Sequence, residues 1–295
     1  MEIRKAERKK AKLRLGIAAP SGAGKTYSAL LLAFGLGGKV GLIDTEHGSG
    51  DLYAHLGDYD IIGIEAPYTV AKYLQAVKTF EQAGYSVIII DSLSHAWAGD
   101  GGLLDKQGKI ADSGKANGFA AWRTITPEHN ALVEAMLRSP CHIIATMRAK
   151  QEYVLETGAN GKQTPKKVGL APVQRDGMEY EFTVMLDVDM NHVASASKDR
   201  TGLFDGAYFK VTRETGEKLL GWLETGTAPE VFEDAVFEGN QLLIMDAQNL
   251  EELKAAFAVA YTYAKRFNNA EAATAATTVY NGRKAELTTQ PEEAA

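Results

Sequence analysis

One short run of residues constrains the fold of this chain more than any other: Ala19-Pro-Ser-Gly-Ala-Gly-Lys-Thr26. It matches the phosphate-loop pattern G-x-x-x-x-G-K-[ST], except that Ala19 stands at the first glycine, where a small residue keeps the turn. An apolar run at 13–19 precedes the loop and a helical pattern at 26–36 follows it. This strand–loop–helix order predicts an α/β core built around a phosphate site.

Each residue type in this loop has its own chemical role. Gly22 and Gly24 let backbone N–H groups turn inward around phosphate oxygens. Lys25 brings a positive charge to the β and γ phosphates, Thr26 offers a hydroxyl to magnesium, and the helix adds the positive end of its dipole. We therefore expect Mg²⁺ and ATP as cofactors, with ATP bound by Pro20, Ser21, Gly22, Ala23, Gly24, Lys25, Thr26 and Tyr27.

Two carboxylates stand at the ends of apolar runs. Asp91 closes the run at 87–91, and a carboxylate at the tip of a buried strand beside a phosphate loop can hold magnesium together with Thr26. Glu46 follows the run at 40–44 and is predicted to be the base that polarises the attacking water. A solvated turn residue is the alternative for Glu46.

Apolar runs alternate with helical patterns through the first half of the chain, which predicts βαβ units and a parallel sheet. Strands are expected at 13–19, 39–44, 60–65, 87–91 and 142–147, with helices at 26–36, 69–83 and 119–138. An antiparallel extension and a closing helix are expected at 180–188, 194–198, 207–211 and 214–223. The connections at 99–118 and 151–177 are expected to be long loops, and loops of this length are often functional.

Charge and composition suggest three parts: a basic segment at 1–12, an ATPase core at 13–226, and an acidic linker with a helical region at 227–295. Within the last part, 230–246 is expected to be a spacer, and 249–267 and 271–287 are expected to be helices. Three interpretations of the basic segment stay open: a nucleic-acid contact, an arm that docks on another subunit, or disorder.

The bulk composition is that of a globular protein, with a net charge of -6. The single cysteine, Cys141, cannot form an intrachain disulfide, which fits a reducing compartment. No run approaches the roughly 18 apolar residues of a membrane span, and no signal peptide is evident. These features predict a cytoplasmic protein, and the histidines lack the spacing of a metal site.

Three further segments resemble those of RecA-type recombinases. Residues 43–47 are similar to the segment whose glutamate is the catalytic base, which corresponds to Glu46. Residues 143–150 resemble the strand that ends in the sensor residue and opens the second DNA-binding loop, with Thr146 where the family has Gln. Residues 197–200 resemble the basic pair that reaches a neighbouring subunit's ATP, which corresponds to Lys198 and Arg200.

Over 13–223 the chain looks most like the short, core-only RecA-like ATPases of bacteriophages, which are associated with single-strand annealing and recombination. The resemblance implies a RecA-like P-loop core, with a mainly parallel sheet and a small helical C-terminal tail. It also implies a ring or filament of identical subunits, DNA-stimulated ATP hydrolysis, and the catalytic residues Lys25, Glu46, Thr146, Lys198 and Arg200. A basic pair supplied in trans would neutralise charge on the leaving phosphates; a surface charge cluster is the alternative.

Most DNA-binding candidates lie in or beside the two long connections, because loops at these places line the filament axis in the resembling family. Basic side chains can track a phosphate backbone, and Tyr153 and Phe119 could stack on bases. Solvated loops with no ligand are the alternative. The basic candidates are Lys106, Lys109, Lys115, Arg148, Lys150, Lys162, Lys166, Lys167 and Arg175.

Three functions remain compatible with these patterns. The first is an ATPase that binds single-stranded DNA for recombination or annealing. The second is a helicase-type ATPase or helicase loader, which directional unwinding would mark. The third is a nucleotide-dependent interaction module whose acidic C-terminal region recruits a replication or recombination partner.

Overall fold

The computed structural model describes residues 5–114, 118–157, 163–227 and 232–289, with the backbone alone described at 118–119, 151–157, 163–170 and 289. The chain divides into two compact units, Met1–Thr227 and Ala228–Ala295. The first contains the sheet and the second contains only helices among its described residues.

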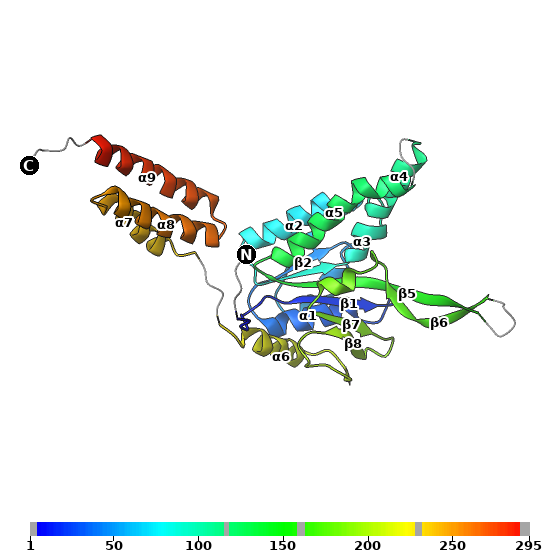
Figure 1. Ribbon diagram of the computed structural model, residues 1–295. Helices are drawn as coiled ribbons and strands as arrows, with labels where there is room; N and C mark the ends of the chain where they lie inside the picture. The colour runs from blue at the N-terminus through cyan, green and yellow to red at the C-terminus, as the bar shows by residue number, and fades with distance from the viewer. Residues whose placement is uncertain (1–4, 115–117, 158–162, 228–231, 290–295) are drawn as a thin grey trace, which may run out of the picture. The chain divides into compact units, whose positions relative to one another are not determined.

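Within the described residues of the first unit, one nine-stranded sheet forms the centre (Figure 1). Its order is β3-β2-β4-β5-β1-β7-β8-β9, with β6 paired to β5 outside this path. The strands from β3 to β7 run parallel, and β8 and β9 continue the sheet antiparallel. The bounds are β1 Arg14–Ala19, β2 Val40–Asp44, β3 Asp60–Gly63, β4 Val87–Asp91, β5 His142–Thr157, β6 Gln163–Pro172, β7 Val184–Val188, β8 Ala194–Asp199 and β9 Tyr208–Phe209.

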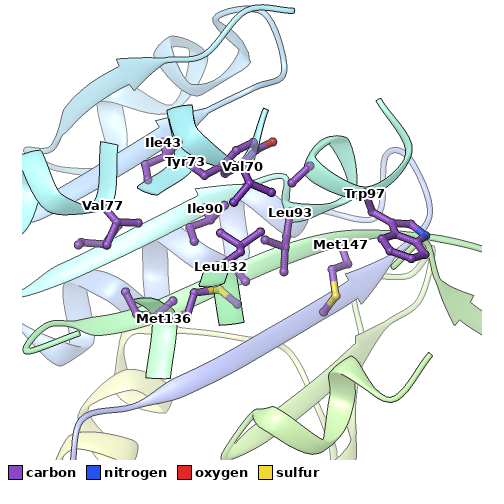
Figure 2. Close-up of a cluster of buried hydrophobic side chains, with 14 of the residues drawn as sticks. Ile43, Val70, Tyr73, Val77, Ile90, Leu93, Trp97, Leu132, Met136 and Met147 are labelled. Atoms are coloured by element: carbon purple, nitrogen blue, oxygen red, sulfur yellow. The ribbon is translucent and has the colours of Figure 1, made fainter. Parts of the chain in front are cut away.

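Helices cover both faces of this sheet, so its central strands are apolar on both sides. In β4, Ile88 and Ile90 belong to one hydrophobic cluster, and Val87 and Ile89 belong to the other. Figure 2 shows the first cluster, where side chains such as Tyr73 of α2 and Leu132 of α5 meet the strands. The helices of the first unit are α1 Lys25–Leu36, α2 Val70–Gln82, α3 Leu93–Ala98, α4 Leu103–Asp112, α5 Gly118–Arg138 and α6 Arg213–Glu224, with short 3₁₀ helices η1 Ser49–Leu56 and η2 Met178–Glu181.

The opposite face is closed by α1 and α6, whose backbones approach closely at two glycines. A Cβ atom on Gly35 would lie 2.1 Å from the carbonyl oxygen of Arg213, and one on Gly216 would lie 2.3 Å from that of Leu32. Since α1 begins at the phosphate loop, this contact fixes the helix on which the loop is mounted.

The predicted α/β fold with a mainly parallel sheet, an antiparallel part and a C-terminal helical region is confirmed. The two predicted long loops are not loops. The first contains α4, and the second is largely a β-hairpin, because β5 continues past the predicted end of its strand and pairs with β6. Figure 1 shows this hairpin extending beyond the edge of the sheet. Smaller corrections are η2 at the start of the expected strand 180–188 and a β9 of only two residues.

The basic segment near the N-terminus packs along α6 in its described part. The Arg8 guanidinium donates to the Trp222 carbonyl at 2.7 Å and lies 4.0 Å from the centroid of that indole ring. Lys10 pairs with Glu224, and Lys9 forms a parallel bridge with Thr227. Two backbone hydrogen bonds join this segment to the end of the first unit: Lys10 N–H donates to the Thr227 carbonyl (3.0 Å), and Thr227 N–H donates to the Arg8 carbonyl (3.1 Å).

The second unit contains α7 Asp234–Asp246, α8 Leu250–Arg266 and α9 Ala270–Thr289. Its own apolar core includes Phe237, Ile244, Leu253 and Ala260. The spacer expected at 230–246 is therefore wrong over most of its length, because Phe237 and Ile244, two helical turns apart, are both buried in this core. Among the described helices, none has the length and hydropathy that a membrane span requires.

Candidate active site

The phosphate loop lies at the carboxyl ends of the parallel strands. Ligands of open α/β sheets usually bind at this edge. Register pairs Asp44 of β2 with Asp91 of β4, and Ala19 of β1 with Arg148 of β5. These strand ends surround a pocket of about 950 Å³. The pocket is lined by loop residues together with Glu46, Asp91 and Arg148.

The loop has the backbone that its glycines predict. Gly22 and Gly24 have φ of 82° and 86°, the left-handed region that favours glycine. Ala19 is the last, fully buried residue of β1, so a side chain is accommodated at the place of the missing glycine. Among the predicted ATP-binding residues, Ser21, Gly22, Gly24, Lys25, Thr26 and Tyr27 line the pocket.

The Lys25 ammonium points back into the loop, where it donates to the carbonyl oxygens of Ala19 (3.3 Å) and Pro20 (3.1 Å). Burial lowers the pKa of Lys25, and the nearby carboxylates of Asp91 and Glu46 act against that shift. Neutral backbone carbonyls are weak partners for an ammonium group, so an anion in the pocket would be a stronger one.

Asp91 connects the loop to the strand on its other side. Its Oδ2 accepts from the Thr26 hydroxyl and its Oδ1 accepts from the Thr146 hydroxyl, both at 2.5 Å. Asp91 is 2% exposed, and this burial raises the pKa of its carboxyl, although the two hydroxyls and Lys25 oppose the rise. A buried carboxylate next to a hydroxyl is an oxygen donor set that suits Mg²⁺, so Thr26 and Asp91 fit the predicted metal.

Thr146 itself is fully buried, and its hydroxyl is directed to Asp91. It therefore supports the predicted metal ligand from behind, and it is not among the residues that line the pocket.

Glu46 lines the pocket as predicted, but it is held by an arginine. The Arg148 guanidinium donates from Nε to Oε1 at 3.0 Å and from Nη2 to Oε2 at 2.6 Å. Burial by itself would raise the pKa of Glu46, whereas the Arg148 hydrogen bond and charge lower it overall. The Arg148 side chain, a candidate for DNA contact in the sequence, thus belongs to the pocket in this structure.

The predicted basic pair lies at the other end of the sheet. Asp199 pairs with Val184 of β7, which pairs with Leu15 near the start of β1, far along the strand from the loop. Lys198 donates to the carbonyls of Glu179 (3.0 Å) and Tyr180, and Arg200 donates to the latter at 3.2 Å. Neither residue is brought to the pocket of its own chain.

The other DNA-binding candidates that the structure describes are spread over α4, α5, the hairpin and the segment after β6. Lys106 pairs with Glu128, and Lys109 pairs with Asp105, both at 2.6 Å. Arg175 lies 5.8 Å from the centroid of the Trp122 ring, and Lys150 is exposed where the hairpin leaves the sheet. The backbones of Lys166 and Lys167 lie on β6, and those of Tyr153 and Phe119 on β5 and α5. The side chains of these four, together with Lys115 and Lys162, lie outside the described residues.

The pocket residues that were missed from the sequence include Tyr53 of η1, His192 of the β7–β8 turn, and Lys210. The His192 Nδ1 lies 3.1 Å from the Ala23 carbonyl oxygen, so this turn supports the loop from the side. No motif spacing points to these residues, because only the folding of distant segments brings them to the loop. The left-handed φ of 62° at His192 has no signal in a sequence.

Comparison with known families gives one relevant match. A family model described as an AAA domain matches residues 11–217, which include the loop, Glu46, Asp91 and Arg148. A comparison with curated proteins gives no match.

Proposed function

The chain belongs to the AAA-domain family of P-loop ATPases, and from this premise we propose that it hydrolyses ATP with a magnesium ion held by Thr26 and Asp91. One observation carries the proposal: three features meet in one pocket of about 950 Å³. They are the phosphate loop, the hydrogen-bonded pair Thr26–Asp91, and the carboxylate of Glu46.

Each residue has a role that its position supports. Backbone N–H groups of the loop and the α1 N-terminus bind phosphate oxygens, and Lys25 exchanges its loop carbonyls for them. When bound, magnesium neutralises charge that develops on the phosphates. Glu46 takes the part of the base that orients and polarises a water molecule.

Glu46→Gln provides the direct test, because glutamine keeps the shape of the side chain and cannot accept a proton. We expect ATP binding to be retained and the rate of phosphate release to fall about a hundredfold or more. Turnover at the wild-type rate would mean that another group is the base, and the absence of magnesium-dependent turnover in wild-type protein would contradict the proposal itself.

We further propose that single-stranded DNA is the partner and that identical subunits share ATP sites. Support for the first comes from β5, which carries Arg148 in the pocket and Thr146 behind Asp91, and which continues into the hairpin with Lys150, Lys166 and Lys167. The position of Lys198 and Arg200, away from their own pocket, is compatible with a role at a neighbouring subunit's site.

The DNA proposal is tested by the steady-state ATPase rate with and without single-stranded DNA at two salt concentrations. Stimulation that weakens with salt is expected, since phosphate contacts release counterions. A rate indifferent to DNA would favour the interaction module, in which the Ala228–Ala295 unit, with its separate core, recruits a protein partner. Directional unwinding of a duplex would favour the helicase-type ATPase.

A further inference from the structure

The Arg148–Glu46 pair sits in the pocket and is open to solvent on one side. The Arg148 side chain is 49% exposed and that of Glu46 is 25% exposed, and both line the pocket with Lys25 and Thr26. An ion pair at this exposure contributes little to stability, so the pairing of the proposed base with Arg148 calls for another explanation.

This pair occupies the carboxylate that hydrolysis would use. Both Glu46 oxygens accept from the guanidinium, and the Glu46 N–H donates to Asp44 Oδ1 at 2.6 Å, which fixes the backbone at that point. A carboxylate held in this way is a weaker base, because the guanidinium stabilises its charged form. In this structure the Glu46 carboxylate is therefore held by Arg148.

The main chain of Arg148 is held on both sides. Its N–H donates to the Ser94 hydroxyl at 2.9 Å, and its carbonyl accepts from Val173 N at 2.6 Å. Its Cα pairs in the sheet with Ala19, the first position of the phosphate loop. The side chain can therefore change partner by rotating about its own bonds, without movement of the strand.

We propose that Arg148 is a positioning residue that exchanges Glu46 for the terminal phosphate of ATP and so frees the base only when that phosphate is present. Arginine is suited to this exchange, because its planar donors match carboxylate and phosphate equally well and the phosphate carries more charge. ADP lacks the terminal phosphate and would leave the pair closed. This inference rests on the proposed ATP site and concerns its regulation.

The test of the phosphate contact uses affinity and not turnover. Magnesium-dependent binding of ADP and of adenylyl imidodiphosphate, an ATP analogue that resists hydrolysis, is measured by calorimetry. Glu46→Gln is compared with Glu46→Gln/Arg148→Met, so that repulsion between Glu46 and phosphate is absent from both. The preference is the Kd for ADP divided by the Kd for the analogue. Loss of the charged contact should reduce this ratio about tenfold, with the Kd for ADP unchanged.

Arg138→Met is the matched control, because Arg138 also pairs with a glutamate, Glu134, but on the exposed surface of α5. It should leave the preference unchanged. If the methionine variant loses ADP binding, Arg148→Lys replaces it, since lysine keeps the charge without the two-pronged geometry. An unchanged preference when Arg148 is replaced would overturn the proposal.

The exchange itself is followed by the NMR signal of the Arg148 Nε–H group, assigned by its loss in Arg148→Lys. Without nucleotide the signal should differ between wild type and Glu46→Gln; with the analogue the two should coincide, and with ADP they should still differ. Coinciding signals without nucleotide, or an analogue that does not move the wild-type signal, would overturn the exchange. Wild-type protein that binds neither nucleotide would overturn the proposed ATP site as well, which separates the two failures.

Discussion

Asp91 joins two parts of the pocket through its two oxygens, one bonded to Thr26 beside the loop and the other to Thr146 of β5. The two hydroxyls fix the orientation of the carboxylate, so it needs little rearrangement to accept a metal. The fully buried Thr146 therefore affects the pocket through Asp91.

Thr146→Val tests this link at the level of one hydrogen bond. Valine has a similar shape but leaves a buried carboxylate oxygen without its donor, so the free energy of unfolding should fall by about 1–3 kcal/mol. Magnesium-dependent nucleotide affinity should fall with it. Chemical denaturation checks the first effect, with Thr146→Ser, which keeps the hydroxyl, as a control close to wild type. Equal stability of the valine and serine variants would contradict the link.

Asp91→Asn should separate stability from function. Burial raises the pKa of Asp91, so folding favours its protonated form, and stability is lost as pH rises from the ordinary value of 3.8 through the raised pKa. Asparagine removes that charge. We expect a stability gain on the order of 1 kcal/mol at pH 7, a gain that fades as pH falls toward 4, and loss of magnesium-dependent turnover.

Denaturation at several pH values measures this dependence. A variant that is less stable than wild type at pH 7 would show that the two hydroxyls and Lys25 outweigh the cost of burying the charge.

At the scale of elements, the contact between α1 and α6 is set by glycine. Gly35→Ala would place a Cβ against the Arg213 carbonyl, so the helices must separate, at a cost of about 1–3 kcal/mol. Gly221→Ala in the same α6 is the control, because nothing lies within 4 Å of its added Cβ. It should be neutral or slightly stabilising, since alanine favours helix. Thermal unfolding of both variants is the measurement; similar melting temperatures would contradict the close packing.

The sequence predicts the parallel strands well because each is a short apolar run buried on both faces, as in β4. It predicts Asp91 and Glu46 beside the loop because the carboxyl ends of parallel strands meet at one edge. The hairpin was missed because β6 carries two lysines and two prolines, residue types that are uncommon in strands. The Arg148–Glu46 pair was missed because it joins residues 102 positions apart.

On the scale of the whole molecule, the two units have separate apolar cores. Removing Ala228–Ala295 should therefore leave the first unit folded, with magnesium-dependent ATP turnover within about twofold of the full chain, as expected for independent sites. Circular dichroism and phosphate release check this. A shortened chain that does not fold would show that the cores depend on each other.

If subunits share ATP sites, two inactive variants should complement each other. Lys25→Ala disables the phosphate loop, and Arg200→Ala removes a cation supplied to a neighbour. Because a mixed assembly contains some sites with an intact loop and an intact Arg200, up to about a quarter of wild-type activity should return at equal mixing. The measurement is phosphate release across mixing ratios. No recovery in an assembly shown to contain both variants would exclude the shared site.

The bridge between Lys9 and Thr227 places the beginning and the end of the first unit side by side. The chain thus enters and leaves this unit at neighbouring points. A short linker could join these two ends, and new termini could be opened at a surface turn, so circular permutation should preserve the fold. The architecture depends on which strands are neighbours, and the point at which synthesis of the chain begins is incidental to it.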